Sequence, residues 1–192
     1  MRTFSILMLA LLLGAASCNK TSSPAELAQL QTQADSLRDS LDHYWQVMMV
    51  SDDVKAYNVG RLLQELSYAD SADPIALERV RMQQEAILSK RYDRQSMAES
   101  AAIDRYDAAT DSLLRSAFQL AATTPGFENY KNGADLAREI KQADDSILLY
   151  RNEYDEWAKS YNLFLKQHGD DLQVLGEPYT TWQPLPIFEL SE

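Results

Sequence analysis

Three pairs of adjacent aspartates are the residues whose type comes closest to acid–base or metal chemistry. They are Asp52-Asp53, Asp144-Asp145 and Asp170-Asp171. Acid catalysis or binding of a divalent cation needs carboxylates that converge from different segments. Neighbouring residues of a helix point about 100° apart and do not face each other. We therefore interpret the pairs as helix caps and solvated faces, and the sequence predicts no catalytic residue, no metal site and no enzyme.

Four aromatic residues near the C-terminal end are the next candidates. They are Tyr150, Tyr154, Trp157 and Tyr161, at spacings of 4, 3 and 4. Rings at this spacing share one face of a helix. Such a face is either a stacking platform for a sugar or peptide, or a part of the core with its hydroxyls at the bundle edge. The sequence leaves both open, and core packing is the simpler account.

The single cysteine, Cys18, lies directly after an apolar N-terminal segment. One cysteine forms no intramolecular disulfide and no cysteine-based metal site. It follows an uncharged, mostly apolar run over residues 4–17, which Arg2 precedes. A bilayer-spanning helix needs about 20 such residues, whereas the apolar core of a secretory signal needs about 7–15. The pattern therefore predicts that residues 1–17 are an export signal.

The string Leu13-Gly14-Ala15-Ala16-Ser17-Cys18 resembles the lipobox of bacterial lipoproteins. The resemblance implies a diacylglyceryl group on the Cys18 thiol, and cleavage that leaves Cys18 as the first residue. An acylated cysteine with several chains anchors a protein stably, where one chain is marginal. Asn19 is not the aspartate that retains enteric lipoproteins in the inner membrane. The resemblance thus implies an outer-membrane protein facing the periplasm, with 18–24 as a lipidated spacer. A plain secretory signal with an incidental cysteine is the alternative.

Composition favours one helical domain. The chain has 192 residues, 45% of them apolar, with only six Gly and six Pro, and many short strands would need more turn residues. Its net charge of −11 disfavours binding to nucleic acid, because an acidic surface repels phosphates. The two histidines lie far apart in the sequence and suggest no metal site or cofactor.

Apolar residues recur with the 3/4 alternation of buried helical seams. Ser23-Pro24-Ala25-Glu26 predicts a capped helix start, and Asp73-Pro74 a second one. The seams contain Leu27, Leu30, Ala34, Leu37, Leu41, Tyr44 and Met48, and later Ile140, Ala143, Ile147, Tyr150, Tyr154, Trp157, Tyr161 and Phe164. We expect an interruption at 51–53, breaks at 69–73 and 123–126, and a last helix that ends at His168-Gly169. Residues 90–99 fit a kink, a loop or an exposed turn.

These segments predict an all-α fold. Seams of this kind are buried most simply by antiparallel packing against one another. We expect an up-and-down bundle of about four long helices over 25–168. Residues 169–192 contain three prolines and are expected to form an extended tail packed on the bundle.

The body of the chain resembles the LemA family of membrane-associated bacterial helical bundles. The motifs are Asp42-His43-Tyr44-Trp45, Leu62-Leu63-Gln64-Glu65-Leu66 and, near the end, Arg151, Tyr154 and Tyr161-Asn162. The family repeats Tyr-Asn seven residues apart, and here the first Asn is Asp155. The resemblance covers roughly residues 40–190. It implies a structural or accessory role and supplies no catalytic residues.

These observations predict a lipid-anchored helical scaffold of the cell envelope that acts through contacts with other envelope proteins. The membrane is contacted through the lipid on Cys18, and no other cofactor is expected. The alternative is a module that binds a glycan or peptide through exposed Tyr and Trp side chains of the last helix. The oligomeric state is left open.

Overall fold

The structure is a computed structural model, and it describes residues 22–188. Its α-helices are α1 (Pro24–Ser67), α2 (Pro74–Ile87), α3 (Ser100–Thr123), α4 (Lys131–Asp145) and α5 (Ile147–Leu175). Four short 3-10 helices lie in the connections: η1 (Leu88–Lys90), η2 (Ser96–Ala98), η3 (Phe127–Asn129) and η4 (Tyr179–Thr181). Residues 22–188 contain no strand, so the predicted all-α class is confirmed.

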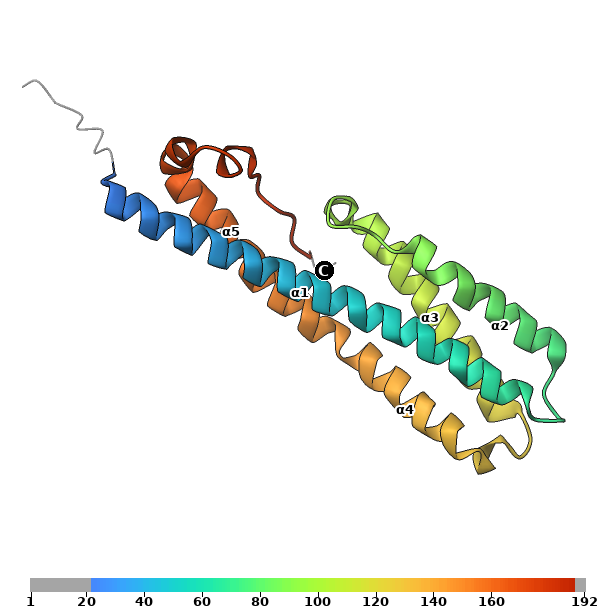
Figure 1. Cartoon of the computed structure of the whole chain (residues 1–192). Helices are drawn as coiled ribbons and strands as arrows, with labels where there is room; N and C mark the ends of the chain where they lie inside the picture. Colours follow the sequence, from blue (N-terminus) through green and yellow to red (C-terminus); the bar gives the residue numbers. More distant parts are fainter. Residues whose placement is uncertain (1–21, 189–192) are drawn as a thin grey trace, which may run out of the picture.

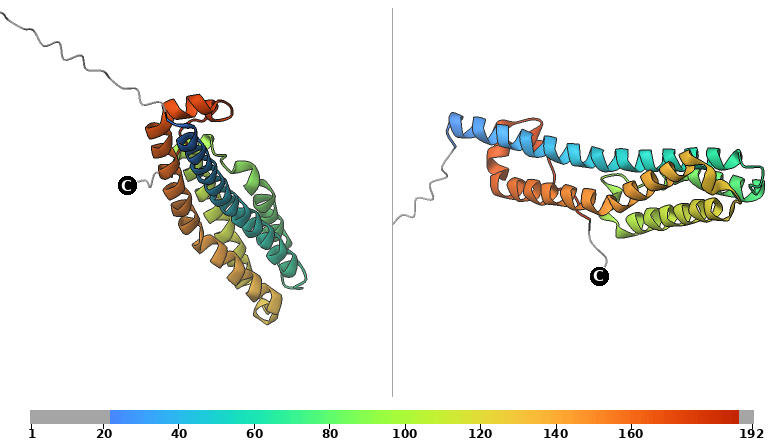
Figure 2. Two further views of the ribbon diagram at one scale, coloured as in Figure 1. Left: turned by 60° about the vertical axis from the view of Figure 1, so that its left-hand side comes forward. Right: turned by 90° about the horizontal axis from the view of Figure 1, so that it is seen from below.

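The helices form an elongated antiparallel bundle in which α1 is the spine (Figure 1). At 1.5 Å per residue, the 44 residues of α1 span about 66 Å. α2 runs back beside the second half of α1, and α3 runs forward again. α4 and α5 then follow one another along the whole of α1, as Figure 2 also shows. The pair α4–α5 acts as the fourth long helix, which confirms the predicted up-and-down bundle.

Both predicted helix starts are present. Ser23 caps α1: its Oγ accepts the N–H of Glu26 at 3.3 Å, while Glu26 Oε2 accepts the N–H of Ser23 at 2.7 Å. This reciprocal capping box satisfies two amides that have no partner within the helix. Asp73 caps α2 by accepting the N–H groups of Ile75 and Ala76.

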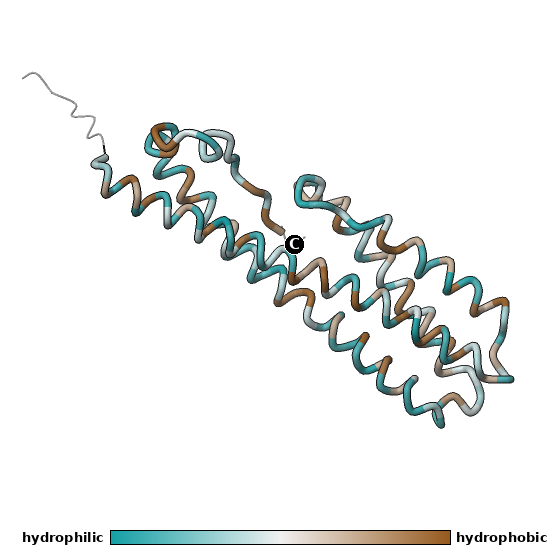
Figure 3. The backbone as a smooth tube through the Cα atoms, viewed as in Figure 1, coloured by the Kyte–Doolittle hydropathy of each residue, from teal (hydrophilic) through white to brown (hydrophobic). Residues whose placement is uncertain are grey.

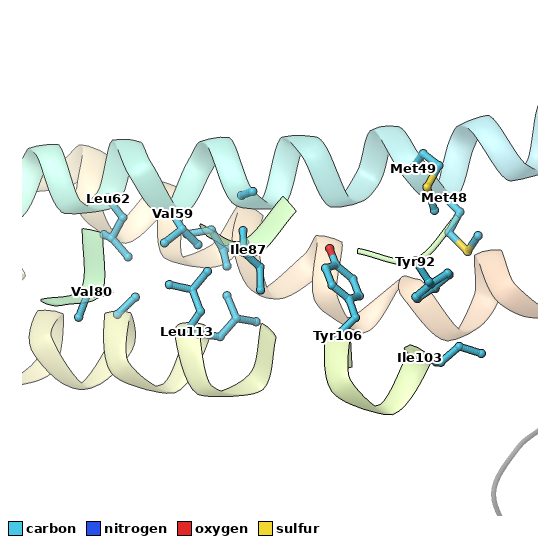
Figure 4. Close-up of a cluster of buried hydrophobic side chains, with 14 of the residues drawn as sticks. Met48, Met49, Val59, Leu62, Val80, Ile87, Tyr92, Ile103, Tyr106 and Leu113 are labelled. Carbon is cyan, nitrogen blue, oxygen red and sulfur yellow. The ribbon is translucent and has the colours of Figure 1, made fainter. Parts of the chain in front are cut away.

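The main core lies where α1, α2, α3 and α4 run together. α1 contributes the fully buried Val59 and Leu62, which pack toward Ile87 of α2 and Leu113 of α3 (Figure 4). Apolar segments recur along every helix on the tube in Figure 3, as expected for amphipathic helices. A smaller core of Leu30, Ala34, Phe164, Leu172 and Tyr179 closes the end where α1 begins. None of the helices within residues 22–188 combines the length and apolar character needed to cross a membrane.

The expected interruption at residues 51–53 is wrong, because α1 continues through it. Asp52 and Lys55 continue the buried seam between Met48 and Val59, at spacings of 4, 3 and 4. They are tolerated because they pair with each other, with 3.2 Å between Lys55 Nζ and Asp52 Oδ1.

The last long helix also differs from its prediction at both ends. The seam from Ile140 onward is divided by Ser146, which separates α4 from α5. α5 does not end at His168-Gly169 but bends there, since His168 has non-helical φ and ψ of −120° and 19°. The helix ends at Leu175, and Gly176 follows with a φ of 79°, a conformation that glycine adopts without strain.

Two further segments are defined by the structure. Residues 91–99 connect η1 to α3 through the short η2, so this stretch is a loop with a single 3-10 turn. Of the predicted tail, residues 169–175 are helical and η4 follows. Among the other tail residues that the structure describes, residues 182–188 are extended and lie against α5 (Figure 1).

Candidate functional site

Cys18, the predicted lipid attachment site, lies outside the described residues, as do the export signal and most of the spacer. The structure fixes the element that follows. Pro24 is the first residue of α1 and comes six positions after Cys18. A chain of this length reaches at most about 21 Å. A lipid on Cys18 would therefore hold the membrane close to the start of the spine of the bundle.

The predicted aromatic face is divided between core and surface. Tyr154 and Tyr161 are fully buried, with 0% exposure, so neither ring offers a face to a ligand in this structure. Trp157 is half-buried and stacks on Tyr44 of α1, with 6.0 Å between ring centroids. Tyr150 is also half-buried and lines a groove described below. The structure thus leaves two of the four rings accessible, on either side of a buried tyrosine.

Tyr154 packs against both α1 and the C-terminal tail. Its ring lies 5.5 Å from Trp45 of α1 and 5.8 Å from Phe188 of the tail, between centroids. Its hydroxyl donates to the carbonyl oxygen of Pro186 at 3.2 Å. Burial raises the pKa of Tyr154 to about 12, so the phenol stays protonated and keeps this donor at physiological pH. The residue therefore has a structural role in holding the tail.

Arg151 also contacts the tail and the residues around it. Arg151 forms a bidentate contact with Asp107 of α3, at 2.8 and 2.6 Å, and donates to the Tyr92 hydroxyl at 3.2 Å. Its guanidinium also lies 5.1 Å from the centroid of the Phe188 ring. Burial raises the pKa of Tyr92 to about 12 against the opposing charge of Arg151. Arg151 thus links α3, α5, the 91–99 loop and the tail.

The two residues of the pair Asp52-Asp53 lie in different environments, one buried and one exposed. Asp52 is 1% exposed and pairs with Lys55, whose Nζ also contacts Asp144 Oδ1 at 3.1 Å. Burial, followed by the nearby Asp52 carboxylate, raises the pKa of Tyr106, whose hydroxyl points toward α1 (Figure 4). Asp53 faces outward and pairs with Arg91 at 2.8 Å. The helix-cap and solvated-face interpretation holds for Asp53 and misses the buried ion pair.

The other acidic pairs have ordinary partners. Asp145 pairs with Lys141 at 3.0 Å, and Asp171 accepts from the Ser22 hydroxyl at 2.7 Å. A cavity of about 410 Å³ lies between Asp52, Asp111 and Asp145, where α1, α3 and the α4–α5 junction meet. Within residues 22–188, no three His, Cys, Asp or Glu side chains are placed to hold a metal ion.

An open groove of about 630 Å³ lies between α1 and the α4–α5 junction. Val47, Val50 and Val54 of α1 form one wall, and Ala143 and Tyr150 lie across from them. Polar side chains such as His43, Gln46 and Glu139 share the lining with these apolar residues.

In comparisons with known proteins, no family model, no curated protein and no solved structure matches the chain. The likeness to the LemA family and to lipoproteins is therefore a prediction that depends on the motifs alone.

Proposed function

We propose that this protein is a lipid-anchored scaffold of the cell envelope, LemA-like in character, which acts through contacts with other proteins. The observation that carries the proposal is the closeness of Cys18 to the start of α1. A lipid at Cys18 would tether one end of a bundle about 66 Å long. The other end, where four helices pack together, would then stand away from the anchor.

The packing of the described residues supports display rather than chemistry. The buried Asp52 and Lys55 pair with each other, and Arg151 pairs with the more exposed Asp107. Tethering raises the concentration of the bundle near partners in the same compartment, and affinity gained this way needs no new contact. A periplasmic side of the outer membrane remains the proposed location.

The experiment compares the wild-type chain with Cys18→Ala in a bacterial host, by detergent phase partitioning and by labelling with an alkyne-tagged fatty acid. The proposal expects the wild type in the detergent phase with label, and the variant unlabelled and either uncleaved or in the aqueous phase. Ser17→Ala is a matched control that keeps the thiol. Equal partitioning and equal labelling of the wild-type and Cys18→Ala chains would contradict the proposal.

A binding module for a glycan or peptide is the second candidate, and the half-buried Tyr44–Trp157 stack favours it. Both side chains are half-buried, so part of each stays accessible to a sugar or peptide. Titration of oligosaccharides against tryptophan fluorescence tests this candidate, with Trp157→Phe as the control. A saturable change that disappears in the variant would favour binding over scaffolding.

A further inference from the structure

The end of the tail, residues 183–188, contacts the bundle in the way that a bound peptide contacts its receptor. We call these residues the tail segment, which runs beside α5 (Figure 1). Within it only Phe188 is buried, at 7% exposure. Its backbone is bound by three side chains of α5, namely Asn162, Tyr154 and Asp155. Backbone contacts give an extended peptide affinity, and a pocket for a side chain gives it specificity.

The Phe188 ring occupies such a pocket. The Phe188 pocket is formed by Tyr92 of the 91–99 loop and by Arg151 and Tyr154 of α5. Both tyrosine rings lie 5.8 Å from the Phe188 ring between centroids and meet it edge to face, at 71° and 78°. The Arg151 guanidinium lies 5.1 Å from the same ring. Edge-to-face and cation–π contacts select an aromatic ring over an aliphatic side chain of similar size.

The walls of the Phe188 pocket are fixed by contacts that do not involve the tail segment. Arg151 is held by its bidentate contact with Asp107 and by the Tyr92 hydroxyl. Trp45 of α1 packs on both Tyr92 and Tyr154, at 6.4 and 5.5 Å between ring centroids. The pocket is therefore preorganised, and a site of this kind binds a ligand without first ordering its own side chains.

The tail segment is less firmly packed than the residues before it. A cavity of about 210 Å³ lies between residues 185–187 and the loop residues Met97 and Ser100. The tail segment contains no charged side chain, so no ion pair holds it. Trp182, which precedes it, packs on Tyr179 at 4.9 Å between ring centroids. Release at residue 183 would thus open the Phe188 pocket and leave the rest of the tail in place.

From these observations we infer that the Phe188 pocket and the three α5 side chains form a peptide-binding site, from which a segment of a partner protein displaces the tail segment. The segment that fits is extended and uncharged and has the pattern Pro-x-Pro-x-Phe, as in Pro184-Leu185-Pro186-Ile187-Phe188. Prolines hold such a segment extended before it binds, so that less entropy is lost. The inference rests on the proposed function, because it names the class of partner that the scaffold contacts.

A partner protein is favoured over a second copy as the source of this segment. Exchange of tail segments between two copies replaces each contact by an identical one, and association costs translational and rotational freedom. The chain's own tail segment also competes at the high effective concentration of an intramolecular ligand. It therefore limits access to the site and acts as an autoinhibitory contact.

Binding of a labelled peptide to the purified full chain tests the site. The probe is a fluorescein-labelled peptide with the sequence of residues 183–188, and fluorescence anisotropy measures its Kd. Phe188→Ala removes the competing ring, and we expect this chain to bind the probe about ten times more tightly than wild type. Phe118→Ala, the matched control, removes a ring of α3 from the same core and should bind as wild type does. A probe with alanine as its last residue should bind Phe188→Ala about ten times more weakly.

Each other outcome contradicts part of the inference. A Phe188→Ala chain that keeps its helix content and gives no saturable binding overturns the site. If that variant does not fold, Phe188→Leu replaces it and should also bind the probe more tightly than wild type. Equal affinities of wild type and the folded Phe188 variant overturn the competition.

Sedimentation of the wild-type chain tests the source of the segment. A dimer that disappears in the Phe188→Ala chain would make a second copy the occupant and would overturn the partner protein. The peptide titration does not depend on a lipid at Cys18. Its failure is therefore distinguishable from failure of the proposed function, which the Cys18→Ala comparison detects.

Discussion

Asn162 of α5 binds the backbone of Leu185 at two points. Its Nδ2 donates to the Leu185 carbonyl oxygen at 2.7 Å, and its Oδ1 accepts the Leu185 N–H at 2.8 Å. An extended segment without a neighbouring strand has no ladder to satisfy its backbone groups. A side-chain amide supplies both partners here, and this contact fixes where the tail crosses the helix.

Replacing Asn162 with Ala is therefore expected to release the tail. Two partly buried backbone groups would lose their partners, which costs about 1–3 kcal/mol in the free energy of unfolding. Amide hydrogen exchange at Leu185 should accelerate, and urea denaturation measures the loss of stability. Leu163→Ala is the control, because that side chain is 54% exposed, and it should change stability by less than about 0.5 kcal/mol. An unchanged exchange rate at Leu185 would contradict this account.

Asp155 is expected to lower the free energy of unfolding as pH rises, whereas most aspartates raise it. Burial raises its pKa, and the N–H of Phe188, 2.8 Å from Oδ1, opposes the shift only in part. Because the folded state holds the proton more tightly than the unfolded state, this residue supports the fold fully below its ordinary pKa of 3.8. That support is lost as pH rises through the folded pKa.

Asp155→Asn keeps an oxygen acceptor for Phe188 and removes the charge. We expect the variant to unfold with a free energy higher by on the order of 1 kcal/mol at pH 7 and nearly equal to wild type at pH 3.5. Urea denaturation across this pH range measures the difference. Asp53→Asn is a control on an exposed carboxylate. A gap between Asp155→Asn and wild type that narrows as pH rises would refute the assignment.

Lys55 is expected to stabilise the fold mainly by neutralising the buried carboxylate of Asp52. Lys55→Met leaves a carboxylate that is 1% exposed without its counter-charge, which costs about 3–5 kcal/mol. Asp52→Asn combined with Lys55→Met removes both charges and should recover a large part of that loss. Thermal and urea unfolding of the single and double variants measure the coupling. Strict additivity of the two substitutions would show that the pair does not interact.

Two glycines offer a matched test of helix packing. A Cβ on Gly133 of α4 would lie 2.4 Å from Cζ of the buried Phe127 ring, whereas a Cβ on Gly169 of α5 would meet nothing within 4 Å. Gly133→Ala is expected to cost about 1–3 kcal/mol through overpacking. Gly169→Ala is expected to be neutral or stabilising by up to about 1 kcal/mol. Melting temperatures of the two variants measure this, and a stable Gly133→Ala protein would contradict the close approach of α4 to Phe127.

The sequence was most informative where local rules decide the structure. Ser23 with Glu26, and Asp73 with Pro74, predicted two helix starts because capping involves only neighbouring residues. Prediction from the sequence failed where contacts between residues far apart in the chain determine the structure. The sequence predicted an interruption at residues 51–53, although the spacing of Asp52 and Lys55 from Met48 and Val59 matches the seam and could have signalled a buried ion pair.

The aromatic face shows the same limit. The 4, 3, 4 spacing correctly placed Tyr154 and Tyr161 on one side of a helix, but it could not show which rings the tail covers. The tail contacts of Tyr154 and Asn162 join residues more than twenty positions apart. The groove beside Val50 is also lined by Ser146, the break between α4 and α5 that no apolar pattern records, because helical spacing continues across it.

The central claim is an acylated Cys18 at the start of the helical rod. Intact-mass and fragment-ion spectrometry of the protein purified from bacterial membranes tests it most directly. We predict a mature chain that begins at Cys18 and carries fatty acyl groups on that residue. A chain with an unmodified Cys18 thiol, or with its first residue elsewhere, would contradict the claim.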